Sequence, residues 1–202
     1  SVESRLDQAF VAKLPESVRV VATFSVGTDH LDIPALKARG IRVLNTPDVL
    51  SNAVAETAVF LTLGVARRAV ESTELIRSGK WQGWTASQLI GFELHGRTAG
   101  IVGMGRIGRE IARKLRGMGM RIAYHNRKPL PSNEAEGSVY HPVLSGLLEA
   151  SDIVILACPS TPDTIGMINR ETLQQMRPGA VLVNIARGTL VDDDALIEAL
   201  DS

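Results

Sequence analysis

The sequence predicts an α/β fold built on a doubly wound parallel sheet. Short runs rich in β-branched residues alternate along the chain with longer segments of helical periodicity, which is typical of parallel sheets with right-handed crossovers. Most of the short runs are apolar throughout, as expected of strands buried on both faces. A glycine-rich turn also joins one such run to a helical segment. We expect strands at residues 18–24, 41–45, 98–104, 121–125, 153–157 and 180–185.

The expected helices have recognisable ends. A helix at 34–39 begins after Asp32, a plausible N-cap, and stops at Gly40. The helix at 106–118 presents an apolar stripe that can face a sheet. Helices at 142–150 and 170–176 are shorter. Asp192 opens the last helix, whose first turn is acidic, as the helix dipole favours.

A long helix is expected at residues 51–77, and it is apolar nearly all round from 57 to 66. Such a helix is buried on several sides, either between two lobes or in the centre of a single domain. Residues 78–96 hold both tryptophans and form a long connecting segment. We therefore divide the chain into a first lobe (1–50), an interlobe helix and connector (51–96) and a second lobe (97–202), with a boundary near 96 as the alternative.

Composition excludes several classes of protein. The chain has 202 residues, 45% apolar and 22% charged, with 22 basic and 22 acidic side chains. This composition excludes a disordered tail, and the absence of net charge disfavours nucleic acid and anionic membranes as partners. The single cysteine, Cys158, excludes a disulfide framework and a cysteine-rich metal site, and suits a cytoplasmic location. We expect no metal. The first residue is Ser1 and the chain stops within a helical pattern, so we expect a piece of a longer protein.

The glycine-rich turn predicts a dinucleotide site. Gly103, Gly105 and Gly108 follow an expected strand and open an expected helix, the context that this motif requires. Gly103 would allow the tight turn, Gly105 the approach of a pyrophosphate to the helix N-terminus, and Gly108 close packing of helix on strand. The alternative is a structural turn that binds nothing.

The next strand end favours NADP (NADPH) over NAD. An NAD site usually has an acidic residue there to hold the ribose 2′-hydroxyl. The chain has Asn126, Arg127 and Lys128 instead, and no acid between Ile111 and Asn133. Cations attract a 2′-phosphate, and arginine can bind it through two hydrogen bonds. The alternative is an ordinary solvated basic loop.

Three other segments follow expected strands. Residues 158–162 form an apolar, proline-stiffened loop, where Cys158 is expected to be a small apolar residue rather than a nucleophile. Arg187, beside Gly188, can hold a carboxylate or simply make a surface ion pair. Near the start of the chain, Gly27 leaves backbone N–H groups free for a small anion, although a simple turn has the same sequence.

Together these motifs resemble the D-isomer-specific 2-hydroxyacid dehydrogenase family. The segment from Tyr124 to Arg127 is similar to that of its NADPH-preferring glyoxylate/hydroxypyruvate reductase branch. The resemblance implies a Rossmann-type nucleotide lobe, part of a smaller flavodoxin-like substrate lobe, and a homodimer paired through the nucleotide lobes. The matching residues lie at 25–32, 45–50, 54–56, 100–108 and 184–188.

The resemblance also implies residue roles. Gly105, Arg106 and Ile107 would hold the pyrophosphate, Pro159 and Thr164 would lie near the adenosine, and Ile185 near the nicotinamide. The backbone of Val26 and Gly27 would bind the substrate carboxylate. Arg187 would bind the carboxylate and polarise the 2-oxo group, as the one catalytic residue assigned in this chain.

The function implied is NADPH-dependent reduction of a small 2-oxo acid, glyoxylate or hydroxypyruvate, to the D-2-hydroxy acid. The family's catalytic Glu and His would follow residue 202, and none of His30, His95, His125 and His141 has the family's catalytic context. We therefore expect residues 1–202 to bind cofactor without turnover. Two alternatives remain: a non-catalytic dinucleotide-binding protein like the family's corepressors, and a dehydrogenase acting on 3-phosphoglycerate or formate.

Overall fold

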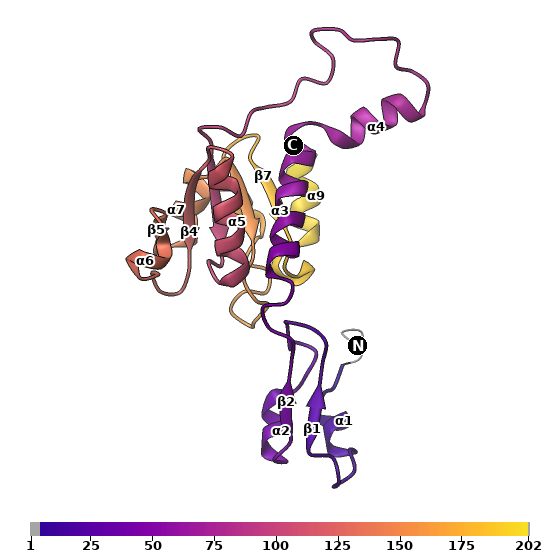
Figure 1. Ribbon diagram of the computed structural model, residues 1–202, viewed down its shortest axis with the longest axis vertical. Helices are drawn as coiled ribbons and strands as arrows, with labels where there is room; N and C mark the ends of the chain where they lie inside the picture. Colours follow the sequence, from indigo (N-terminus) through magenta and orange to yellow (C-terminus); the bar gives the residue numbers. More distant parts are fainter. Residues whose placement is uncertain (1–4, 202) are drawn as a thin grey trace. The chain divides into compact units, whose positions relative to one another are not determined.

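The computed structural model describes residues 5–201 and forms two compact units, Ser1–Leu50 and Ser51–Ser202 (Figure 1). Each unit is described by itself. The segment from 51 to 96 belongs to the second unit. No helix within residues 5–201 is long and apolar enough to cross a membrane.

The first unit is a small α/β layer. Its strands β1 (Val20–Ala22) and β2 (Arg42–Leu44) pair in parallel, with Val21 opposite Val43. Two short helices, α1 (Gln8–Ala12) and α2 (Ile33–Ala38), complete it. Side chains of Asp7 and Asp32 cap these helices by accepting the N–H groups of Phe10 and Ala35. The buried core consists of Val11, Leu31, Leu36 and Ile41.

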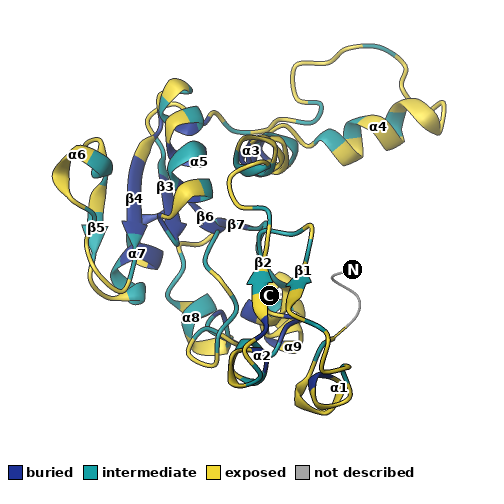
Figure 2. Ribbon diagram, turned by 60° about the horizontal axis from the view of Figure 1, so that its bottom comes forward, coloured by how far each residue is buried: buried dark blue, intermediate teal, exposed yellow. Residues whose placement is uncertain are grey.

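The second unit contains the doubly wound parallel sheet that the sequence predicts. From β3 the chain moves outward through β4 to β5, then returns to place β6 on the other side of β3, followed by β7 (Figure 2). All four pairings are parallel. Strand β5 was not predicted, because it is only three residues long. The strands are β3 (Thr98–Val102), β4 (Arg121–His125), β5 (Val139–His141), β6 (Ile153–Leu156) and β7 (Val181–Asn184).

Alternate residues of the central strands face opposite layers of the core. Ile101 and Ile155 join the cluster beneath α3 (Ser51–Ala66) and α5 (Arg106–Gly117), whereas Val102 and Leu156 join the one beneath α7 (Leu144–Ala150). The sheet is therefore buried on both faces (Figure 2), as its continuous apolar strands predict. The remaining helices are α6 (Ser132–Ala135), α8 (Arg170–Gln174), a 3-10 turn at Gly188–Leu190, and α9 (Asp193–Leu200), which Asp192 caps.

The prediction of one long helix at 51–77 is wrong. Helix α3 ends at Ala66, and α4 (Ala69–Arg77) begins after Arg68, whose φ of 52° is left-handed. The Ala66 carbonyl oxygen accepts the N–H of Phe92 at 3.0 Å. This oxygen therefore bonds to the loop instead of continuing the hydrogen bonding of the helix. Gly91 permits this approach, since a Cβ there would lie 2.1 Å from the Ala66 oxygen.

Within the described chain, helix α3 is buried along one side only. Ala55, Ala58, Thr62 and Ala66 are buried, but Phe60 on the other side is 67% exposed. The expectation of burial on several sides therefore fails within one chain, and α3 presents an apolar outer face.

Candidate functional site

The sheet gathers the predicted cofactor residues at one edge. In a parallel sheet the carboxyl ends of all strands lie together, and the loops that follow them form the ligand-binding edge. Val26 and Gly27 belong instead to the first unit. The loops after β3, β4, β6 and β7 carry the rest: Gly103, Gly105, Arg106, Ile107 and Gly108; Asn126, Arg127 and Lys128; Pro159 and Thr164; Ile185 and Arg187.

The three glycines of the turn after β3 differ in the space that surrounds each of them. Gly103 has a φ of 98°, and a Cβ there would lie 2.6 Å from the backbone N of Cys158. A Cβ at Gly108 would lie 2.3 Å from the Gly103 oxygen, whereas one at Gly105 would meet nothing within 4 Å. The α5 N-terminus has no side-chain cap and no acid in its first turn. Open space before uncapped N–H groups fits a pyrophosphate.

Asn126 ties the basic loop after β4 to the glycine-rich turn. Its side-chain Oδ1 accepts the N–H of Met104 at 2.7 Å, and its backbone oxygen accepts the hydroxyl of Tyr140 at 3.1 Å. The Tyr124 hydroxyl accepts the N–H of Leu130 at 2.9 Å. The loop is thus held at three points. Nothing in the spacing of Asn126 had signalled this bond, because it spans 22 residues.

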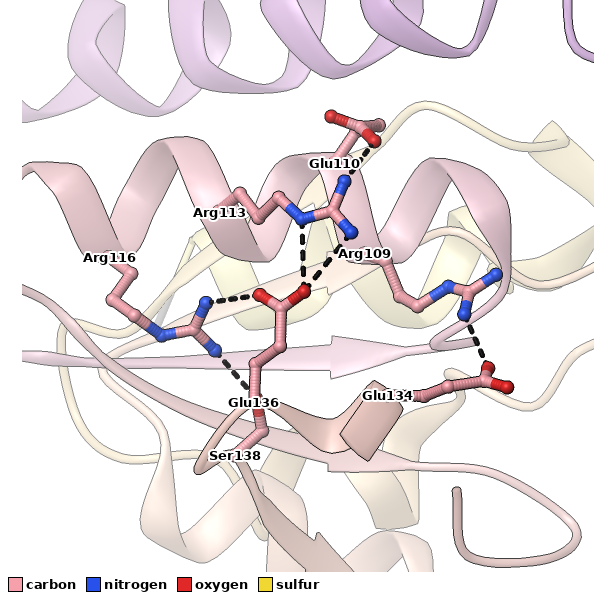
Figure 3. Close-up of polar contacts among 7 residues, drawn as sticks. All are labelled: Arg109, Glu110, Arg113, Arg116, Glu134, Glu136 and Ser138. Atoms are coloured by element: carbon pink, nitrogen blue, oxygen red, sulfur yellow. Dashed lines mark hydrogen bonds and ion pairs between the residues drawn. The ribbon is translucent and has the colours of Figure 1, made fainter. Parts of the chain in front are cut away.

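The two acids that follow the basic loop are neutralised by arginines of α5 (Figure 3). Glu134 pairs with Arg109. Glu136 accepts from Arg113 and Arg116, each at 3.1 Å. The hydrogen bond from Arg113 is the main reason that the pKa of Glu136 lies below its ordinary value.

Arg127 and Lys128, in contrast, are exposed and make no ion pair with any residue in the described part of the chain. Because the nearby carboxylates are paired with α5, the positive charge of this loop is not cancelled locally. The guanidinium group of Arg127 and the ammonium group of Lys128 can attract a phosphate.

The loop after β6 is held by its own hydroxyl group. Thr164 Oγ1 donates to the Pro159 oxygen and accepts the N–H of Thr161, both at 2.8 Å. Cys158 is half-buried, and burial raises the pKa of its thiol. Its Sγ lies 3.8 Å from Sδ of Met167. This environment disfavours a thiolate nucleophile, in keeping with the apolar role expected for Cys158.

Asn184 braces the turn that carries Arg187. Its Oδ1 accepts the N–H of Ala186 at 3.0 Å, and its Nδ2 donates to the Arg187 oxygen at 2.8 Å. Arg187 is half-buried and extended, with φ −137° and ψ 139°. The sequence analysis missed Asn184 as a bracing residue, although an asparagine at the end of a strand, just before a turn, is a usable signal.

In the first unit, residues 25–28 form the candidate anion loop. The Val26 oxygen accepts Nδ2 of Asn45 at 2.9 Å, and the Gly27 oxygen accepts the Ser25 hydroxyl at 2.7 Å. Among residues 5–201, no group accepts the backbone N–H of Gly27 or of Thr28. The carbonyl oxygens of this loop already accept hydrogen bonds, while these two N–H groups are available to donate, so the loop is suited to bind an anion. Asn45 is another contributor that the sequence analysis missed.

A family model confirms the family that the motifs resemble. The model for the NAD binding domain of D-isomer specific 2-hydroxyacid dehydrogenases matches residues 59–202. The chain belongs to this family. For a 2-hydroxyacid dehydrogenase, the glycine-rich turn after β3 and the open α5 N-terminus are the expected place of the nicotinamide dinucleotide.

Relatives in the 2-hydroxyacid dehydrogenase family match almost the whole chain. A glyoxylate reductase from Pyrococcus furiosus is 47% identical over 98% of the chain and 60% of its own length. A glyoxylate reductase/hydroxypyruvate reductase from Mus musculus is 39% identical over 100% and 62%. The solved glyoxylate reductase from Paecilomyes thermophila superposes with a TM-score of 0.91 at 38% identity, over 98% and 59%. The chain thus spans about three fifths of these relatives.

Proposed function

We propose that the protein containing this chain reduces a small 2-oxo acid, glyoxylate or hydroxypyruvate, to the D-2-hydroxy acid with NADPH. The observation that carries the cofactor preference is the basic pair Arg127 and Lys128, which no described carboxylate neutralises. The names of the relatives support the 2-oxo acid substrate. They favour a reductase over the corepressor-like alternative.

The chain's own residues have separable tasks in this proposal. The backbone from Gly105 to Ile107 holds the pyrophosphate, Arg127 and Lys128 hold the 2′-phosphate, and the amide nitrogen of Asn126 faces the ribose. The absence of side chains at Gly103 and Gly108 lets the turn pack against the residues that follow β6 and against β3. Bound there, the dinucleotide supplies the hydride. Pro159 and Thr164 stay near the adenosine, and Ile185 near the nicotinamide.

Substrate binding is assigned to two carboxylate-binding elements. The N–H groups of the loop at Val26 and Gly27 bind the carboxylate, and Arg187 both binds it and polarises the 2-oxo group. An arginine fork orients the carboxylate, which places the carbonyl carbon in one position. Arg187 is the catalytic residue in this chain.

We also assign the exposed apolar face of the second unit to a homodimer. Large apolar side chains are exposed along α3, α4 and the following segment, and exposure of this extent marks interaction surfaces. The side chains are Phe60 (67% exposed), Val65 (52%), Val70 (70%), Ile76 (64%), Trp81 (52%), Trp84 (82%) and Ile90 (65%).

The cofactor assignment is tested by reversing the charges of the basic loop. In the double variant Arg127→Glu/Lys128→Glu, the Kd for NADPH should rise by on the order of 100-fold, because two charge-assisted contacts are lost. The Kd for NADH should change by less than about threefold, since it has no 2′-phosphate. Both constants can be measured by fluorescence titration.

Arg121→Glu is the matched control, because Arg121 is exposed at the opposite end of the same strand. Equal weakening of both cofactors by the double variant would refute the NADPH preference. Steady-state oxidation of NADPH by the intact protein with glyoxylate and with hydroxypyruvate tests the reaction. Absence of turnover with either acid would refute the substrate proposal.

A further inference from the structure

His30 is a buried histidine outside the cofactor site. The residue is only 7% exposed, and its Nδ1 has no hydrogen-bond partner among the described residues. Nε2 lies 3.2 Å from Oγ1 of Thr23. A buried ring nitrogen without a partner requires an explanation, because an apolar side chain would fill the same space without that cost.

The ring is one end of a continuous hydrogen-bonded chain. Thr23 Oγ1 lies 2.9 Å from Oγ of Ser25, and the Ser25 hydroxyl donates to the Gly27 oxygen at 2.7 Å. We call His30, Thr23, Ser25 and the Gly27 carbonyl the loop relay. It ends inside the loop to which the substrate carboxylate is assigned.

Counting protons sets the direction of the loop relay. A hydroxyl has one proton. Ser25 gives its proton to Gly27, so Ser25 must accept from Thr23. Thr23 has then used its own proton, so it must accept from Nε2 of His30. The ring is therefore the Nε2–H tautomer, and Nδ1 is the unprotonated nitrogen that needs no acceptor.

Hydrogen bonds to the Gly27 and Val26 oxygens fix the orientation of two peptide planes in the loop. In a trans peptide the C=O and the N–H of the next residue point in opposite directions. Holding the Gly27 oxygen through Ser25 therefore aims the Thr28 N–H, and holding the Val26 oxygen through Asn45 aims the Gly27 N–H. Both N–H groups are left available on the side away from the clamped carbonyls.

We infer that His30 is a positioning residue for the reaction: through Thr23 and Ser25 it holds the Gly27 carbonyl, and with it the Thr28 N–H, in the loop that binds the substrate carboxylate. This inference rests on the proposed function of residues 25–28. His30 neither touches the substrate nor transfers a proton in this role. Its contribution is to maintain the geometry of an anion site whose N–H groups must converge.

The first experiment needs no turnover. Long-range ¹⁵N–¹H spectra of the ring nitrogens in the intact protein should show His30 as the Nε2–H tautomer. On titration with oxalate, an unreactive dicarboxylate, the amide signals of Gly27 and Thr28 should shift in the wild type. In Ser25→Ala these shifts should require on the order of 10-fold more oxalate, because one anchoring hydrogen bond is lost. An Nδ1–H tautomer or an unchanged titration would overturn the inference.

The second experiment separates positioning from folding. In Ser25→Ala and His30→Leu, the KM for the 2-oxo acid should rise on the order of 10-fold while the Kd for NADPH is unchanged. His30→Gln keeps a donor near Nε2 and should restore most of the loss. Ser17→Ala, at an exposed position of the same unit, is the control. Parallel losses in KM, NADPH binding and folded yield would make the role merely structural and overturn the inference.

The two experiments also separate this inference from the proposed function. If the wild type reduces no 2-oxo acid but its Gly27 and Thr28 amides respond to oxalate in a Ser25-dependent manner, the proposed reaction fails and the loop relay stands. If turnover is normal and Ser25→Ala leaves KM unchanged, the proposed reaction stands and the loop relay fails.

Discussion

At the scale of single residues, asparagines contribute most to the geometry of the candidate site. Asn126 holds the glycine-rich turn through Met104, Asn184 braces the turn of Arg187, and Asn45 clamps Val26. An amide side chain both donates and accepts, so it can fix a loop to a distant backbone group. The bonds of Asn126 and Asn45 span 22 and 19 residues and depend on the fold, so these two roles did not follow from spacing along the chain. Asn184 binds groups only two and three residues away, so its role left a local signal.

Asn126 also offers the sharpest test of cofactor preference. Asn126→Asp keeps an oxygen that can accept the Met104 N–H, which lies 2.7 Å from Oδ1, but places a carboxylate oxygen on the ribose side. NADPH affinity should fall at least 10-fold while NADH affinity is retained or improved, because an acid repels a 2′-phosphate and binds a 2′-hydroxyl. Fluorescence titration measures both constants.

Asn126→Ala is the informative comparison for that test. It removes the oxygen that accepts from Met104, so it should weaken both cofactors. If Asn126→Asp weakens NADH binding as strongly as Asn126→Ala does, the amide does not face the ribose.

At the scale of elements, the contact of α5 with β3 depends on the absence of a side chain at Gly108. A Cβ there would lie 2.3 Å from the Gly103 oxygen and 3.3 Å from Cγ2 of Ile101. Gly108→Ala should therefore lower the free energy of unfolding by about 1–3 kcal/mol, measured by urea denaturation. Gly117→Ala, in the same helix with nothing within 4 Å of a Cβ, should raise it by about 0.4–1 kcal/mol. Equal effects would contradict the packing argument.

The ion pairs between α5 and residues 134–138 make the stability of this region depend on pH (Figure 3). The pKa of Glu136 is lowered in the folded protein, mainly by its hydrogen bond from Arg113. A carboxyl with a lowered pKa stabilises the fold above its unfolded value, and this stabilisation is lost as the pH falls through the folded value. The Tm difference between wild type and Glu136→Gln should therefore shrink as the pH falls from 7 to below about 4.

Glu93→Gln is the control for the pH series, because Glu93 is exposed and forms no ion pair with a described residue. High salt should reduce the effect of Glu136→Gln as well. A Tm difference that is constant from pH 7 to pH 3 would show that the charge of Glu136 does not stabilise the fold.

At the scale of the whole molecule, the apolar outer face of α3 and α4 predicts a homodimer. Phe60→Glu should convert the dimer to a monomer, because a charge at a position now 67% exposed would be buried against the partner. Sedimentation velocity measures the change. Val139→Glu, 60% exposed on β5, should leave the dimer intact. A monomeric wild type at high micromolar concentration would contradict the prediction.

The sequence by itself determined the class of fold, the positions of all described strands except β5, and the glycine-rich turn. These follow from local patterns: continuous apolar runs specify doubly buried strands, and glycines directly between strand and helix specify a phosphate-binding turn. Observed strand ends fall within three residues of those expected, and β4 matches the expected 121–125. The family resemblance held for the same reason, since its motifs are contiguous.

Only the tertiary structure decided where the long helix breaks, which distant side chains brace the loops, and that His30 is buried beside Thr23. The break after Ala66 depends on a hydrogen bond to Phe92, 26 residues away. Strand β5 has only three residues and forms by pairing with the edge of β4. Pairings between distant residues leave no periodic trace in a sequence, because they exist only once the chain has folded and brought those residues together.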